Sequence, residues 1–245
     1  MTANGNAPLA LLTGGSATSD GTATLTATAV GVTSAVLAPF VDASTISQVG
    51  GSLDAKLTLS SSSLNLEDLE GDVVLDRLNL TVAELPVTQR MPTRVVARGG
   101  IARIQSWAWE SEGTSIDVTG QVHLSDRQTS IQANGKLDAR LLTPFLGASG
   151  GVNTAGQVTT HLSISGPLTE PTINGDVRLA NGELRLRQPR MVASELNGTA
   201  VLARGNVFVT SLIGTVNGGK LSGSGQLQYT PELRGQFMSM LRPRG

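Results

Sequence analysis

The sequence predicts an all-β protein built from repeats of about 105 residues. Three observations support this fold class: a composition suited to strands and turns, an alternation of apolar and polar residues, and an internal repeat. Of the 245 residues, 29 are glycine and 10 are proline, and only 15% are charged. Such a mixture favours many short strands and turns over long helices. At ordinary strand lengths, about 16 to 20 strands fit into the chain.

The strands are predicted from apolar side chains at every second position, which places them on one side of a strand. This alternation is clear over residues 53–59, 118–124 and 158–164. The pair Asn181-Gly182 interrupts another alternating stretch. It predicts either a tight turn between two strands or a glycine bulge within one long strand.

An internal repeat connects distant parts of the chain. The segment 36–41 (VLAPFV) recurs as 141–146 (LLTPFL), and 71–75 (GDVVL) recurs as 175–179 (GDVRL). These matches keep the same order and differ in offset by only one residue, so they indicate a repeated structural unit.

The repeat predicts three parts of the chain. Residues 1–45 are expected to be the end of a preceding β-repeat, residues 46–149 one β-groove repeat, and residues 150–245 a truncated second repeat. Both ends of the chain are therefore expected to be cuts through a longer protein. Residues 1–6 contain no basic side chain, which argues against a signal peptide at this end.

Two features inside the repeat predict local structure. Alternation slips by one residue between Ile104 and Trp107, and again between Val209 and Leu212, so we expect a bulge at each place.

One short helix is also expected per repeat. Thr33 and Asp138 occupy equivalent positions in the two copies, and both residue types are good helix N-caps. Pro39 and Pro144 follow a few residues later and limit each helix to one or two turns.

Nearly every predicted strand presents the same apolar side, and no long helix is predicted that could cover it. One solution is a β-sandwich or β-solenoid with a filled core. Another is a single curved sheet whose apolar side remains an open groove that suits acyl chains. Periodicity alone does not separate these two arrangements. The residues predicted to share the inner, groove-lining side are Leu57, Leu59, Val73, Leu75, Val122, Leu124, Val158, Leu162, Val177, Leu179, Leu184, Leu186, Val209, Leu221 and Leu227.

Composition and motifs argue against catalysis and against nucleic-acid binding. The formal net charge is −1, cysteine is absent and there are two histidines, so we expect no nucleic-acid partner, no metal site and no cofactor. Residues 214–220 have the spacing of a phosphate-binding loop, but Leu221 stands where that motif needs Ser or Thr. Residues 147–151 have the spacing of a nucleophile elbow, without the strand before and the helix after it. We therefore expect that the protein is not an enzyme.

Two groups of large side chains have more than one interpretation. Trp107 and Trp109 point to the same side of a strand, where they either grip a ligand or fill a wide place near the bulge. Two arginine clusters either contact anionic headgroups or are solvated charges that discourage edge pairing. These clusters are Arg185, Arg187 and Arg190, and Arg234, Arg242 and Arg244.

Residues 166–179 (GPLTEPTINGDVRL) and 207–225 resemble a recurrent signature of the TamB and AsmA-like envelope proteins, and residues 50–125 match it more loosely. The signature combines a Gly, a Pro and a second Gly with a return strand that begins Gly-Gly, here Gly218-Gly219. The resemblance implies an elongated single curved sheet. Its apolar side forms a β-groove that conducts phospholipids between the inner and outer membranes and supports outer-membrane assembly.

The resemblance also implies partners and a location. The expected partners are phospholipid acyl chains and an outer-membrane β-barrel of the assembly-factor class, similar to TamA. The expected location is the periplasm of a bacterial cell envelope, with an inner-membrane anchor outside this chain. Two other functions stay open: a chaperone groove for outer-membrane β-barrel or autotransporter clients, and a structural or adhesive β-repeat.

Overall fold

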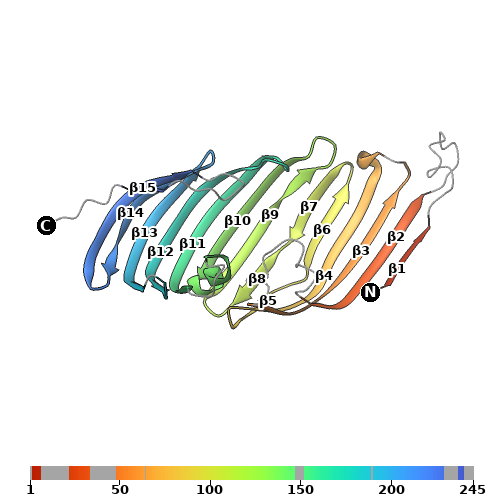
Figure 1. Ribbon diagram of the computed structural model, residues 1–245. Coiled ribbons are helices and arrows are strands. Elements are labelled where there is room, and N and C mark those ends of the chain that lie inside the picture. The colour runs from red at the N-terminus through yellow and green to blue at the C-terminus, as the bar shows by residue number, and fades with distance from the viewer. Residues whose placement is uncertain are drawn as a thin grey trace.

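The computed structural model describes residues 2–6, 22–33, 48–63, 65–146, 152–188, 190–228 and 237–239. These residues form one antiparallel sheet of sixteen strands, which runs the length of the molecule (Figure 1). The strands are β1 (Thr2–Asn6), β2 (Ala23–Thr33), β3 (Val49–Ser61), β4 (Leu69–Val82), β5 (Leu85–Gln89), β6 (Thr93–Arg98), β7 (Ile101–Ser106), β8 (Ala108–Ser111), β9 (Thr114–His123), β10 (Gln128–Asp138), β11 (Val152–Pro167), β12 (Thr172–Leu186), β13 (Met191–Ala203), β14 (Asn206–Val216), β15 (Gly219–Gln228) and β16 (Phe237–Ser239).

The sheet is a meander in which each strand pairs with a neighbour in the sequence, except at its centre. There, β4 pairs with both β5 and β6, and β9 pairs with both β7 and β8. The chain leaves the sheet between β5 and β6 at Arg90–Pro92, where Pro92 lacks the N–H that a continuous ladder would use. The half-length strands β5 and β6 therefore share one strand position beside β4, and β7 and β8 share the next position, beside β9.

Strand positions carry the offset seen in the sequence. β2 spans residues 23–33 and β10 spans 128–138, while β9 begins at Thr114 and β15 at Gly219, so both pairs differ by 105. The sheet continues across the expected repeat boundary, because β10 pairs with β11 from Gln128 to Asp138.

Both predicted bulges are confirmed. Ile104 pairs with Val95 while Ser106 pairs with the adjacent Arg94, which leaves one residue of β7 unmatched. β14 shifts its register against β15 between Val209 and Leu212. Such bulges bend a strand and increase its local twist.

The Asn181-Gly182 pair forms a bulge rather than a tight turn. β12 continues from Thr172 to Leu186, and its register against β13 shifts between Leu179 and Gly182. Asn181 takes the left-handed conformation, with φ of 50°, which Asn tolerates better than most residues.

The expectation of one short helix per repeat is not borne out. The place after Thr33 lies outside the described residues. After Asp138 the chain forms only a 3₁₀ turn, η3 (Ala139–Leu142), followed by a single α-helical turn, α3 (Thr143–Leu146). A further 3₁₀ turn, η2 (Leu66–Asp68), joins β3 to β4.

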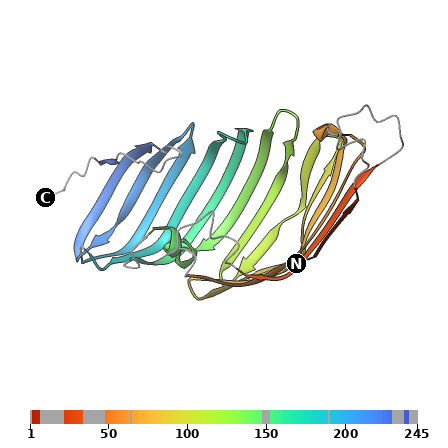
Figure 2. The same cartoon turned by 45° about the vertical axis from the view of Figure 1, so that its right-hand side comes forward.

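The fold is neither a two-sheet sandwich nor a filled solenoid, because all described strands belong to one sheet. In Figure 2 the strands near the N-terminal end are seen more nearly edge-on than β9 to β15, so the sheet twists along its length. A single open sheet leaves at least part of its apolar side uncovered.

Candidate functional site: the aliphatic face

The pairing register divides the sheet into two faces, because directly paired residues of antiparallel strands project to the same side. Leu137 pairs with Val158, and Val158 pairs with Leu179, so three neighbouring strands present aliphatic side chains side by side. We call this side the aliphatic face and the opposite side the outer face.

Every predicted lining residue that lies in a strand falls on the aliphatic face. Leu124 lies just beyond β9, where its backbone N–H donates to the carbonyl oxygen of Gly100 at 2.8 Å. The other predicted residues are connected through paired positions from β3 to β15; they are Leu57, Leu59, Val73, Leu75, Val122, Val158, Leu162, Val177, Leu179, Leu184, Leu186, Val209, Leu221 and Leu227.

Sequence reasoning missed part of this face, mainly beside bulges and half-length strands. In β4 the register shift moves the inward positions from odd to even numbers, so Leu78 and Leu80 face the same side as Leu75. A bulge shifts the alternation of apolar and polar residues by one position. That shift in the sequence is the signal by which Leu78 and Leu80 could have been predicted. Other missed members are Leu25, Val82, Leu85, Val87, Val95, Ile104, Ile131, Ile164, Ile173, Leu196, Leu202, Val207 and Leu212.

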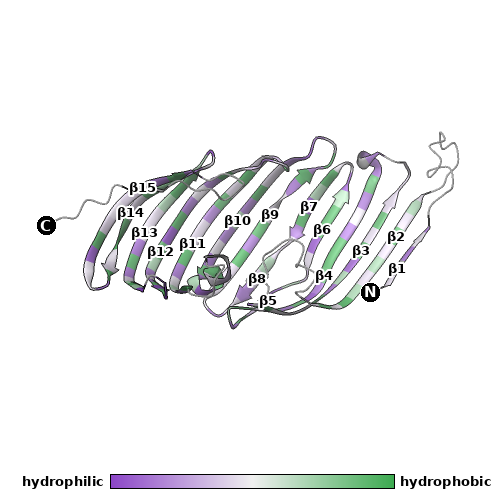
Figure 3. Ribbon diagram, viewed as in Figure 1, coloured by the Kyte–Doolittle hydropathy of each residue, from purple (hydrophilic) through white to green (hydrophobic). Residues whose placement is uncertain are grey.

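Among the charged residues of the described strands that have a pairing partner, none is paired with a member of the aliphatic face; Asp76 and Glu195 lie at bulges and have no pairing partner in the register. The resulting alternation is visible as coloured bands along the strands in Figure 3. On the outer face, Arg94 is paired with Asp72, and His161 lies 3.3 Å from Asp176. The hydrogen bond from Arg94 lowers the pKa of Asp72. These exposed ion pairs contribute little to the stability of the fold. The significant feature is that charged and aliphatic side chains lie on opposite faces of the sheet.

One part of the aliphatic face is covered by residues 139–146, which we call the cover segment. Leu141 is 8% exposed and packs with Leu85 and Val87 of β5 in the buried cluster of the sheet. Between β10, which precedes the cover segment, and β5 lie β9 and β8, so the segment crosses over them. In Figure 1 it lies in front of the sheet, near the lower ends of these strands.

Polar contacts hold the cover segment in place. The Thr154 hydroxyl, on β11, donates to the carbonyl oxygen of Ala139 at 2.7 Å and lies 2.6 Å from the Thr143 hydroxyl. Asp138 caps the segment by accepting a hydrogen bond from the Arg140 N–H at 2.8 Å. The side-chain hydrogen bond from Arg140 also lowers the pKa of Asp138. The ionised Asp138 carboxylate therefore stabilises the folded protein at pH values above the ordinary carboxyl pKa. This stabilisation is lost as the pH falls through the lowered pKa of Asp138.

We predict that Leu141→Ala destabilises the protein by about 2 kcal/mol, because it removes buried methyl groups and leaves a cavity against β5. Leu168→Ala is the matched control, since Leu168 is 51% exposed in the β11–β12 turn. It should change the free energy of unfolding by less than about 0.5 kcal/mol. Urea denaturation measures both variants, and equal losses would contradict the assignment of Leu141 to the cover.

The two tryptophans lie together beside the cover segment. Their ring centroids are 5.3 Å apart. Trp109 pairs with Gln89 and Ile116 on the aliphatic face and packs against the Leu85 cluster. Its indole N–H donates to the Thr93 hydroxyl at 2.9 Å. Trp109 thus fills space near the bulge, in agreement with the packing interpretation.

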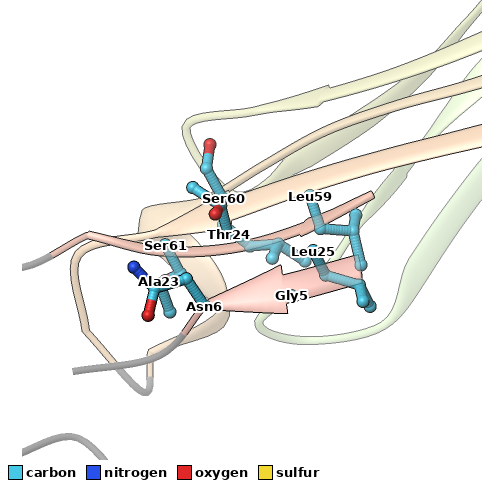
Figure 4. A pocket seen from close by; sticks show the side chains of 9 residues that line it. Gly5, Asn6, Ala23, Thr24, Leu25, Leu59, Ser60 and Ser61 are labelled. Atoms are coloured by element: carbon cyan, nitrogen blue, oxygen red, sulfur yellow. The ribbon is translucent and has the colours of Figure 1, made fainter. Parts of the chain in front are cut away.

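A cavity of about 380 Å³ lies at the N-terminal end of the aliphatic face. Leu25, Leu59 and Leu69 line it, together with Gly5 and Ser61. Figure 4 shows Leu25 of β2 and Leu59 of β3 next to each other at its wall. Leu25 is 39% exposed, so an aliphatic side chain is accessible to a ligand here.

The remaining motifs do not form a second site in the described residues. Residues 214–220 run along β14, a turn and β15, so no helix follows them to bind phosphate. Residues 147–151, and the cluster of Arg234, Arg242 and Arg244, lie outside the described part. Within that part, no group of three acidic or histidine side chains could hold a metal ion. No described helix has the length and apolarity needed to cross a membrane.

The aliphatic face is therefore the feature from which a function can be inferred. No family model, curated protein or solved structure matches the chain.

Proposed function

We propose that this chain is a non-enzymatic groove segment that holds phospholipid acyl chains along its aliphatic face and lets them move from strand to strand. The observation that carries this proposal is the series of paired aliphatic residues from β2 to β15, with every charged strand residue that has a pairing partner on the outer face.

The physical reason is the hydrophobic effect. Each methylene group of an acyl chain gains about 0.8 kcal/mol when it leaves water. Because neighbouring strands present similar Leu, Val and Ile side chains, a bound acyl chain moves from one strand to the next at little cost in free energy. A charge on this face would lose its hydration under a bound chain, which is unfavourable. That no charged residue is paired with a member of the aliphatic face thus supports a role in conducting acyl chains.

The resemblance of the sequence to TamB and AsmA-like proteins suggests a cellular setting for the proposal. In that setting the chain is part of a periplasm-spanning protein anchored in the inner membrane by a segment outside this chain. Phospholipids move between the two membranes, and a TamA-like outer-membrane barrel is the expected partner. Repeats of about 105 residues would lengthen the groove without changing its lining.

The experiment is extraction of the purified chain followed by mass spectrometry of what co-purifies. We expect phospholipids in a defined ratio to protein. Recovery of peptides from outer-membrane barrel or autotransporter clients instead would favour the chaperone groove. A chain that carries neither, and that takes up no acyl-chain probe when one is added, would contradict the proposal and favour a structural or adhesive β-repeat.

A further inference from the structure

The turn between β12 and β13 places positive charge directly beside the aliphatic face. Leu186, the last residue of β12, pairs with Met191, the first residue of β13, and also with Val152 of β11. All three side chains lie on the aliphatic face and are half-buried. Arg187 and Arg190 lie in the turn that joins these two strands, and both are exposed.

Unlike Arg185 and Arg140, these two arginines have no charge partner among the described residues. Arg185 lies 3.2 Å from Glu183, and Arg140 lies 2.7 Å from Asp138, so both are compensated locally. Neither Arg187 nor Arg190 has a side-chain hydrogen bond or ion pair with any described residue. Their charges are free to meet a ligand.

The surroundings of the turn favour an anion at this end of the strands. The adjacent β14–β15 turn consists of the uncharged Asn217 and Gly218, and Lys220 follows it on the outer face. Of the acids on β12 to β15, Asp176 and Glu183 have partners, and Glu195, at the β13 bulge, has no ion pair with a described residue. At the opposite end of the same strands, the turns carry both signs, with Glu170 in one and Arg204 in another.

We infer that Arg187 and Arg190 bind the anionic headgroup of an amphiphile whose acyl chain lies over Leu186 and Met191. This inference rests on the proposed function and adds the charge class of the ligand to it. A guanidinium group donates two parallel hydrogen bonds to a phosphate or carboxylate, so Arg suits this role better than Lys. Each arginine near an anionic group raises the affinity by about fivefold at moderate ionic strength.

The test uses two amphiphiles with the same twelve-carbon chain, dodecyl phosphate and zwitterionic dodecylphosphocholine, both as monomers. Isothermal titration calorimetry measures their affinities for the full chain. We expect the native protein to bind dodecyl phosphate about tenfold more tightly or better. In Arg187→Gln/Arg190→Gln this preference should disappear, while the affinity for dodecylphosphocholine stays within about twofold of the native value. The matched control is Arg178→Gln, on the outer face of β12, which should keep the preference.

The possible failures are distinguishable. Equal affinity for the two amphiphiles in the native protein, or an unchanged preference in the double variant, would overturn the inference and leave the proposed function intact. If neither amphiphile binds, the proposed function itself fails. Inorganic phosphate that binds as tightly as dodecyl phosphate would show an anion site independent of the aliphatic face, which also overturns the inference.

Discussion

Val73→Asp is expected to weaken acyl-chain binding by more than about tenfold while leaving the fold in place. Val73 lies on the aliphatic face between Leu57 of β3 and Val95 of β6, yet it is 43% exposed in the free protein. The new carboxylate therefore stays hydrated until an acyl chain covers it. Binding then requires either removal of that hydration or a detour of the chain, and both reduce affinity.

The chain offers an unusually close control for this substitution. Val201 of β13 is 42% exposed but lies on the outer face, where it pairs with Asp176 and Phe208. Val201→Asp introduces the same charge into a strand at the same exposure. Because it lies opposite Asp176, it also places two like charges side by side, and the loss of stability this causes is read from thermal unfolding, separately from binding. Binding of a fluorescent fatty acid and thermal unfolding by circular dichroism measure the two variants. If both variants bind alike, the aliphatic face is not the binding surface.

Gly175→Ala is expected to lower the free energy of unfolding by roughly 3 kcal/mol, through backbone strain and overpacking together. Gly175 has φ of 150° in β12, a conformation that residues with a side chain rarely adopt. A Cβ at this position would lie 2.0 Å from the carbonyl oxygen of His161 on β11. Because that atom belongs to the backbone, relief requires the two strands to move apart and lose ladder hydrogen bonds.

Gly223→Ala in β15 is the matched control, since no atom lies within 4 Å of the position of its Cβ. It is expected to be neutral or slightly stabilising, because alanine restricts the unfolded chain more than glycine does. Urea denaturation measures both variants. A Gly175→Ala protein as stable as the native one would mean that β11 and β12 do not approach each other as described.

The local part of the fold could be predicted from the sequence. Alternation in residues 53–59 and 158–164 correctly placed Leu57 and Leu162 on a common face, because side-chain direction in a strand depends only on position parity. The slip between Val209 and Leu212 predicted a bulge for the same reason.

The contacts that depend on distant pairing could not be predicted. The cover segment is one example, because Leu141 meets Leu85 only where the sheet brings β5 and β10 into reach. Its helical turns were overestimated from Asp138 and Pro144, because a single turn gains little helical stability of its own. The sequence grouped Arg185 with Arg187 and Arg190 in one cluster. The structure separates them, because Arg185 has Glu183 as an ion-pair partner and the other two have no partner among the described residues.

The measurement that tests the central claim most directly is quenching of tryptophan fluorescence by phospholipids with brominated acyl chains. Trp107 and Trp109 are the two tryptophans of the chain, and their rings lie together beside the aliphatic face. The control is Trp107→Phe/Trp109→Phe/Phe208→Trp, which moves the probe to the outer face, where Phe208 pairs with Val201. We predict strong quenching of the native pair and little quenching of the control at equal lipid occupancy. Equal quenching of both proteins, or none of the native pair while lipid is bound, would contradict an acyl-chain groove on the aliphatic face.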